Sequence, residues 1–138
     1  MELLQFATLS DHFNPENTIT HNELRFMFDE AERTLSCLFS VVLTERDTET
    51  PVLKAEMMSG FEIKPDSVEL VTKGDEIVFP ANIIAHFASL TYSSLRGAIY
   101  IKAENTVFSG FILPVQNIQE QIKKPYVIKK YQTKISEK

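Results

Sequence analysis

Two runs of alternating apolar and polar residues constrain the fold of this chain more than any other feature. The first run places apolar side chains at every second position: Leu35, Cys37, Phe39, Val41 and Leu43. The second run does the same with Leu53, Ala55, Met57, Phe61 and Ile63. A period of two is typical of a strand with one buried face, and the short polar link at residues 46–51 allows antiparallel pairing. The two runs therefore predict a long antiparallel hairpin.

Two shorter segments predict further strands. Leu4, Phe6 and Thr8 occupy one face of a first strand, and residues 24–28 alternate in the same way. Turn-forming residues fill positions 10–17 between them. No helix-length segment separates the strands, and this argues against parallel βαβ units.

The periodicity changes after residue 64. Residues 66–70 predict a short helical turn, and Pro80 suits the first turn of a long helix. Apolar residues then recur at helical spacing: Ile84, Phe87, Ala88, Thr91, Leu95, Ala98 and Ile99. Gly97 weakens a helix, which predicts either a bend or a close contact there. A last helix is expected to begin at 115–117 and to include Ile118 and Ile122, which gives an α+β domain with helices on the apolar face of an antiparallel sheet.

Length and composition fit one ordinary domain. The chain has 138 residues, of which 43% are hydrophobic and 24% charged, and this is enough to form a core without disulfides or metals. A single cysteine and the lack of a secretory signal predict a cytoplasmic location. No apolar run is long enough for membrane insertion.

Charge is unevenly distributed along the chain. Residues 1–122 carry eight basic and 18 acidic side chains, whereas residues 123–138 carry six lysines and one acid. An acidic body repels phosphate, so no nucleic acid partner is expected. The basic C-terminal tail, residues 125–138, is expected to be weakly ordered and to act as a solvated end.

The sequence contains little that resembles catalytic chemistry. Its three histidines, at positions 12, 21 and 86, lack partners at metal-ligand spacing, and its four glycines are too scattered for a phosphate loop. Cys37 occupies an inward strand position, where a thiol behaves as a small apolar group. The acidic pairs Glu30/Glu32 and Asp75/Glu76 lack a third ligand in sequence. We therefore expect no catalytic residue, no metal and no cofactor, and a binding protein instead of an enzyme.

The segment 107–113 is unusually apolar for a connection between helices. It places five large apolar side chains in seven residues: Val107, Phe108, Phe111, Ile112 and Leu113. Such residues either cover the sheet edge or cap a helix, or they line a groove for apolar peptides or a subunit interface. The sequence alone leaves both interpretations open.

The order of these elements resembles the SecB family of bacterial export chaperones, including its solitary and toxin–antitoxin-associated members. The resemblance spans about residues 3–122. It depends on the paired runs 34–43 and 52–63, Phe79-Pro80 before the long helix, Leu95-Arg96-Gly97 near its end, and Leu113-Pro114 before the last helix.

The resemblance implies a SecB-like domain over residues 1–124, with a four-stranded antiparallel sheet, two helices on one face and assembly as a tetramer, a dimer of dimers. It implies an ATP-independent holding chaperone that binds unfolded or nascent polypeptides. By position, the client groove would contain Phe108, Phe111, Ile112 and Leu113, with Leu4 and Phe6 of the first strand and Ile118 of the last helix.

The C-terminus departs from this family. Export-dedicated members end in a Cys- and His-containing zinc segment that docks on the SecA motor, and residues 122–138 contain neither residue type. SecA is therefore not expected as a partner through that contact. The alternative hypothesis is a dedicated interaction protein with the same fold that binds one partner, such as an antitoxin.

Overall fold

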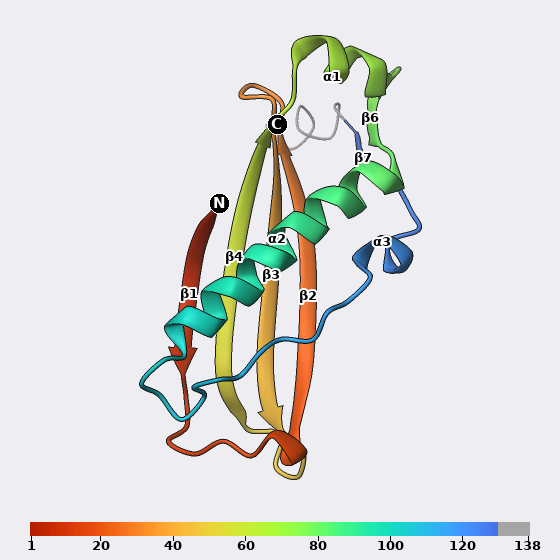
Figure 1. The fold of residues 1–138 in the computed structure, drawn as a ribbon. Helices are drawn as coiled ribbons and strands as arrows, with labels where there is room; N and C mark the ends of the chain where they lie inside the picture. The colour runs from red at the N-terminus through yellow and green to blue at the C-terminus, as the bar shows by residue number, and fades with distance from the viewer. Residues whose placement is uncertain (130–138) are drawn as a thin grey trace, which may run out of the picture.

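The main structural unit is a four-stranded antiparallel sheet with the strand order β1-β4-β3-β2. The computed structural model describes residues 1–129. The strands are β1 (Glu2–Thr8), β2 (Thr18–Asp29), β3 (Thr34–Glu45) and β4 (Pro51–Glu62), and a short 3-10 turn, η1 (Pro15–Asn17), precedes β2. This confirms the predicted α+β class and its four-stranded sheet (Figure 1).

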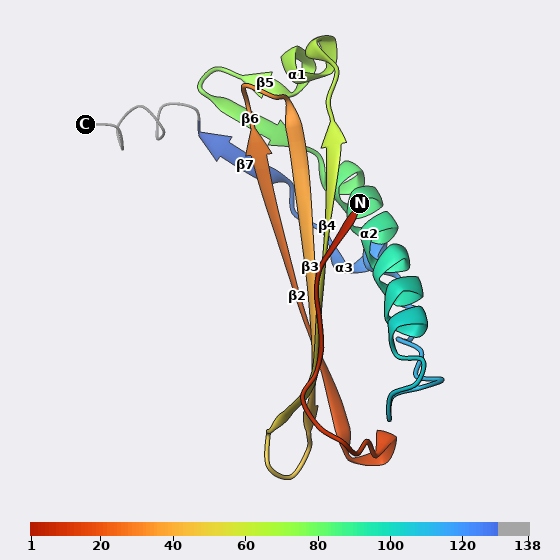
Figure 2. The ribbon, with the colours of Figure 1, turned by 90° about the vertical axis from the view of Figure 1, so that its left-hand side faces the viewer.

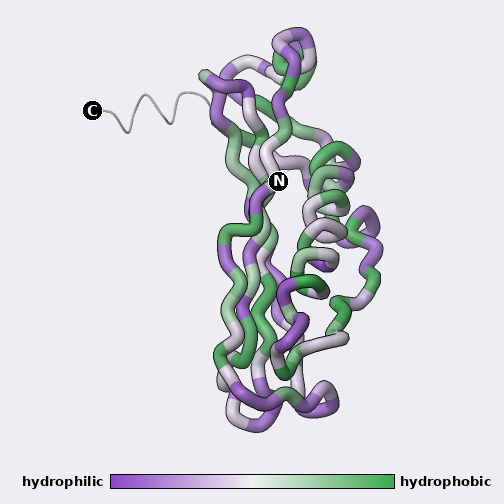
Figure 3. The backbone as a smooth tube through the Cα atoms, turned by 60° about the vertical axis from the view of Figure 1, so that its left-hand side comes forward, coloured by the Kyte–Doolittle hydropathy of each residue, from purple (hydrophilic) through white to green (hydrophobic). Residues whose placement is uncertain are grey.

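The central hairpin of β3 and β4 forms as the alternation predicts. Every second side chain of β3 from Leu35 to Leu43 is buried, and Leu53, Ala55 and Met57 of β4 are buried beside them. Figure 3 shows the same alternation of hydrophobic and hydrophilic residues along the long strands. Strand β2, at the edge of the sheet next to β3, is longer than the predicted 24–28. All twelve of its residues pair with β3 in one unbroken register.

The prediction that Leu4 and Phe6 share a face of β1 is wrong. The β1–β4 register shifts between Leu3 and Gln5, so a bulge at Leu4 interrupts the alternation. Leu3 and Phe6 both pack against the core, whereas Leu4 stays 45% exposed.

Helix α2 (Ala81–Lys102) crosses one face of the sheet, and the short helix α3 (Ile118–Gln121) lies beside it. Figure 2 shows the sheet nearly edge-on, with α2 on one side. The third helix, α1 (Pro65–Val71), lies near one end of the sheet (Figure 1). Gly97 marks no bend, because α2 is continuous through it, and a Cβ placed there would meet nothing within 4 Å.

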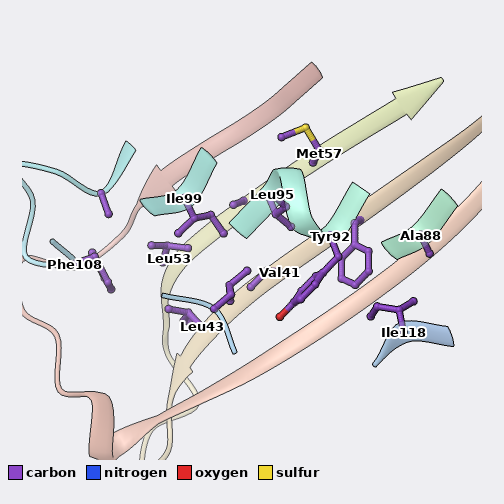
Figure 4. Packing of buried hydrophobic residues seen from close by; sticks show 14 of the residues in the cluster. Val41, Leu43, Leu53, Met57, Ala88, Tyr92, Leu95, Ile99, Phe108 and Ile118 are labelled. Carbon is purple, nitrogen blue, oxygen red and sulfur yellow. The ribbon is translucent and has the colours of Figure 1, made fainter. Parts of the chain in front are cut away.

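The core lies between the sheet and α2. Tyr92, Leu95 and Ile99 of α2 pack on Val41, Leu43 and Leu53 of the sheet (Figure 4). The Phe39 and Tyr92 rings are 5.0 Å apart. Each fully buried side chain of this size contributes roughly 1.5–3 kcal/mol, so this interface accounts for much of the stability of the domain.

A second, three-stranded sheet contains β5 (Thr72–Lys73), β6 (Glu76–Phe79) and β7 (Tyr126–Lys129). Strand β7 pairs with β6, and the Tyr126 hydroxyl donates a hydrogen bond of 2.9 Å to the Phe26 carbonyl of β2. Residues 126–129 of the predicted tail thus form strand β7. The rest of the predicted tail, residues 130–138, lies outside the described residues.

Candidate polypeptide-binding surface

The predicted client-binding residues centre on the segment that joins α2 to α3, residues 103–117, hereafter the crossover segment. It folds as successive turns: the backbone N–H groups of Thr106, Ser109 and Phe111 each donate to the carbonyl three residues earlier. Asn105 and Gly110 both have positive φ, at 66° and 83°. Glycine adopts such angles without steric cost, which allows the chain to reverse at Gly110.

Two side chains of α2 hold the returning half of the crossover segment. The Tyr92 hydroxyl donates to the Pro114 carbonyl at 2.7 Å, and Arg96 Nε donates to the Leu113 carbonyl at 2.9 Å. The Gln116 side-chain amide donates to the Tyr92 oxygen at 3.1 Å. Burial raises the pKa of Tyr92, so its hydroxyl keeps the donated proton at neutral pH. These bonds attach residues 113–116 to α2.

Three of the predicted groove residues belong to the core in this structure. Phe108 and Leu113 are fully buried, and Ile118 is nearly so. All three join the main cluster beneath α2 (Figure 4). As placed here, they cannot contact a client directly, so the interpretation that the apolar connection covers the core applies to them.

The other predicted residues differ in exposure. Phe6 and Phe111 are half-buried and pack on the edge of the same cluster. Ile112 and Leu4 are exposed, at 57% and 45%, and belong to no buried cluster. The structure thus brings Phe6, Phe108, Phe111, Leu113 and Ile118 together, and leaves Ile112 and Leu4 outside.

Exposed apolar side chains nevertheless remain on the crossover segment and on α2. Val107, Ile112 and Val115 are exposed on the segment, and Val115 reaches 80%. Ile112 also lines an open hollow of 350 Å³ with Ser93, Arg96, Gly97 and Tyr100 of α2. We call these five residues the α2 hollow. The surface of this hollow is mostly apolar. Its only charged residue is Arg96, whose Nε donates a hydrogen bond to the Leu113 carbonyl.

Two features of this surface were missed by sequence reasoning. Helix α2 exposes a second apolar row, because Ile83, Leu90 and Gly97 follow one another at seven-residue intervals on its outer side. Phe13, in the presumed polar connection 10–17, packs on Phe108 and Phe111 with ring centroids 4.8 and 5.5 Å away. A lone phenylalanine among turn formers was the available signal for the second feature.

A further apolar hollow lies at the other end of α2, under α1. Its volume is 290 Å³, and its lining includes Ile63, Val71, Phe79, Ile83 and Phe87. The stacked rings of Phe61 and Phe87, 4.0 Å apart, lie next to this region. Unlike the α2 hollow, it contains no predicted site residue.

Cys37, the single thiol of the chain, is buried in the core. Burial raises the pKa of the Cys37 thiol to about 11, so it is protonated at neutral pH and a poor nucleophile. Within residues 1–129, no three His, Cys, Asp or Glu side chains converge closely enough to hold a metal ion. Over the same residues, no helix combines the length and apolar character needed to cross a membrane.

Comparison with protein-family models, with curated proteins and with solved structures gave no match for this chain. The fold and its surfaces are therefore the basis for a functional proposal.

Proposed function

We propose that this protein is an ATP-independent holding chaperone of SecB-like type that acts in the cytoplasm on unfolded or nascent polypeptides. The observation that carries the proposal is the exposed apolar surface formed by the crossover segment and the C-terminal end of α2. Ile112, Val115 and Ile101 are each more than half exposed, although the chain buries a full core elsewhere. Contiguous exposed apolar surface on a folded domain commonly marks a binding site.

The chemistry of this surface suits a client of loosely defined sequence. Burial of apolar area contributes about 25 cal/mol per Å² and carries little directional preference. No cofactor, metal or nucleotide is needed for such binding. The proposed contact residues are Ile112 and Val115, whereas Phe108, Leu113 and Ile118 support them from the core.

Replacement of Ile112 by Ser tests this assignment. The wild-type protein is expected to suppress the aggregation of citrate synthase diluted from guanidinium, at near-stoichiometric ratio and without nucleotide. Ile112→Ser should weaken suppression severalfold and change the free energy of unfolding by less than about 1 kcal/mol, because the side chain is largely exposed. Light scattering at 360 nm and urea unfolding measure the two effects.

Leu70→Ser provides a matched control. Leu70 is 81% exposed on α1, at the opposite end of α2 from the crossover segment (Figure 1). This variant should suppress aggregation as well as the wild type does. Equal loss in both variants, or no suppression by wild-type protein in excess, would contradict the proposal.

A dedicated interaction protein with one partner, such as an antitoxin, is the second candidate. It is favoured by the burial of Phe108 and Leu113, because a smaller exposed surface suits one complementary partner better than many clients. A pull-down from the source cell distinguishes the two: one dominant protein supports the dedicated role, and a broad spectrum supports the general one.

We also propose that the protein assembles as a tetramer, a dimer of dimers. Ile83, Leu90 and Gly97 form a row with the seven-residue spacing typical of helix–helix seams. A second copy of α2 is the partner that this row fits.

A further inference from the structure

The loop between β1 and β2, residues 9–17, lies over the crossover segment, and we call it the strap. Phe13 is its only aromatic residue, and its ring contacts both Phe108 and Phe111. The contact with Phe111 is edge-on, at an interplanar angle of 83°. Phe13 therefore forms part of the cover that keeps Phe108 out of solvent.

The strap is fastened by its backbone at both ends. The Leu9 N–H donates to the Val52 carbonyl at 2.8 Å, and the Arg46 N–H donates to the Asn17 carbonyl at 2.8 Å. Within the described part of the chain, no backbone hydrogen bond joins residues 10–13 to another element. The middle of the strap is thus held by side chains alone.

Two side chains make that attachment. One is Phe13, and the other is His12, whose Nε2 lies 3.2 Å from Glu45 Oε1 at the end of β3. Behind them is a hollow of 160 Å³, lined by His12, Phe13 and Asn14 of the strap and by Glu45 and Val52 of the sheet. This open space gives the strap room to move, and the packing contacts that it gives up on moving are those of Phe13 with Phe108 and Phe111.

The charges around His12 favour its protonated form. Asp11 lies 3.2 Å from Nδ1, and Glu45 faces Nε2; these are the charged groups that face the ring. The hydrogen bond with Asp11, followed by the charge of Glu45, raises the pKa of His12 above its usual value of about 6.5. The attraction between His12 and Glu45 is therefore present below that usual value and is lost as the pH rises through the raised pKa.

We propose that the strap is a pH-dependent cover, which closes over Phe108 and Phe111 while His12 contacts Glu45 and opens when that contact is lost. Opening exposes the two rings to an apolar segment of an unfolded polypeptide. This proposal builds on the holding function above and explains how a crossover segment with buried aromatic residues can still bind clients. An exposed ion pair is weak, so its loss shifts the balance between closed and open strap without unfolding the domain.

A tryptophan at position 13 reports strap opening without any client. The chain has no tryptophan, so Phe13→Trp adds a single fluorophore that still packs as an aromatic ring. We expect acrylamide quenching to rise at least about twofold between pH 6 and pH 8.5 as the ring becomes accessible to water. His12→Gln in this background should abolish the pH dependence. His21→Gln should preserve it, because His21 contacts the Thr44 hydroxyl instead of a carboxylate.

Hydrogen exchange of the unmodified protein gives a second measurement, free of any effect of the tryptophan. Exchange at Phe108 and Phe111, whose amides donate to the Thr106 hydroxyl and to the Phe108 carbonyl beneath the strap, should be faster at pH 8.5 than at pH 6 once corrected for the intrinsic pH dependence of amide exchange. Equal protection at both pH values, or a transition that persists in His12→Gln, would overturn the pH-dependent strap.

Phe13→Ala distinguishes a cover from a client contact. As a cover, its removal should increase the capture of unfolded citrate synthase at pH 6 severalfold. A decrease would show that Phe13 is itself a contact and would overturn the inference. If the strap opens in the fluorescence assay but no variant prevents aggregation at any pH, then the holding function fails while the strap stands.

Discussion

Phe108→Ala is expected to lower the free energy of unfolding by about 3–5 kcal/mol, the usual cost of truncating a fully buried phenylalanine. Phe108 is fully buried, lies among Leu43, Leu53 and Ile99 in Figure 4, and touches the Phe13 ring at 4.8 Å. Little can collapse into the space that it leaves, because the sheet and α2 surround it. Urea unfolding followed by circular dichroism at 222 nm measures the change.

Val107→Ala is the matched control for this substitution. Val107 is the neighbouring residue on the same segment, but it is exposed, so the loss should stay below about 1 kcal/mol. If Phe108→Ala leaves the urea midpoint unchanged and weakens client binding alone, then Phe108 lines an accessible groove, as the family resemblance implied. The two outcomes differ by several kilocalories per mole, well outside the error of the method.

The sheet was largely predictable because its signal is local. Alternation along β3 and β4 specifies which face is buried, and the structure confirms it from Leu35 to Leu43 and at Leu53, Ala55 and Met57, whereas Phe61 is only partly buried and Ile63 lies beyond the end of β4. The first half of β2 was missed because all of its side chains except Ile19 are polar, so it shows no alternation of apolar and polar residues. These residues join the sheet through backbone hydrogen bonds to β3, which leave no mark on side-chain pattern.

The small sheet illustrates a different limit. Strand β7 is short, begins just after a proline and lies in a lysine-rich stretch. Each of these features is typical of a weakly ordered tail, which is what the sequence predicts. Its partner β6 is about fifty residues earlier, and Phe79↔Tyr126 pairing stacks two aromatic rings 6.4 Å apart. Such non-local pairing depends on where the chain returns, which local periodicity does not specify.

At the candidate site, the sequence indicated the apolar composition but not the direction in which each side chain points. The apolar character of the crossover segment was evident, but composition does not indicate whether a loop side chain faces inward or outward. Tyr92 and Arg96 of α2 donate to the Pro114 and Leu113 carbonyls, and in this backbone position Leu113 faces the core and Ile112 faces solvent. In β1 a bulge at Leu4 has a similar effect: Leu3 packs against the core in place of Leu4, and Leu4 is exposed.

Gly97→Leu is expected to dissociate the proposed tetramer. Glycine in the middle of a helix costs about 1 kcal/mol relative to alanine, and no contact within this chain offsets that cost, since a Cβ at position 97 would meet nothing within 4 Å. With Ser93 one turn earlier in the same open hollow, the glycine lets another backbone approach closely. Light scattering should give a wild-type mass near four times 15.8 kDa and a smaller mass for the variant, with helical circular dichroism retained.

Gly97→Ala separates two explanations of this glycine, an exposed helix position and a subunit contact. The first predicts a more stable fold with unchanged mass, and the second predicts a weaker tetramer. Suppose first that the outer side of α2 faces only solvent. Alanine and leucine then both improve helix propensity, so each should raise the free energy of unfolding by up to about 1 kcal/mol and leave the mass unchanged. If a second α2 packs across this position, the single methyl group already crowds the crossing, and the tetramer should dissociate at a higher protein concentration than the wild type does.

Ile112→Ser is measured in the same way, because Ile112 borders the hollow and a lost client contact must be separated from a lost subunit contact. A wild-type monomer, stabilised by both substitutions, would remove self-assembly from the proposal and leave the crossover segment as the only binding surface.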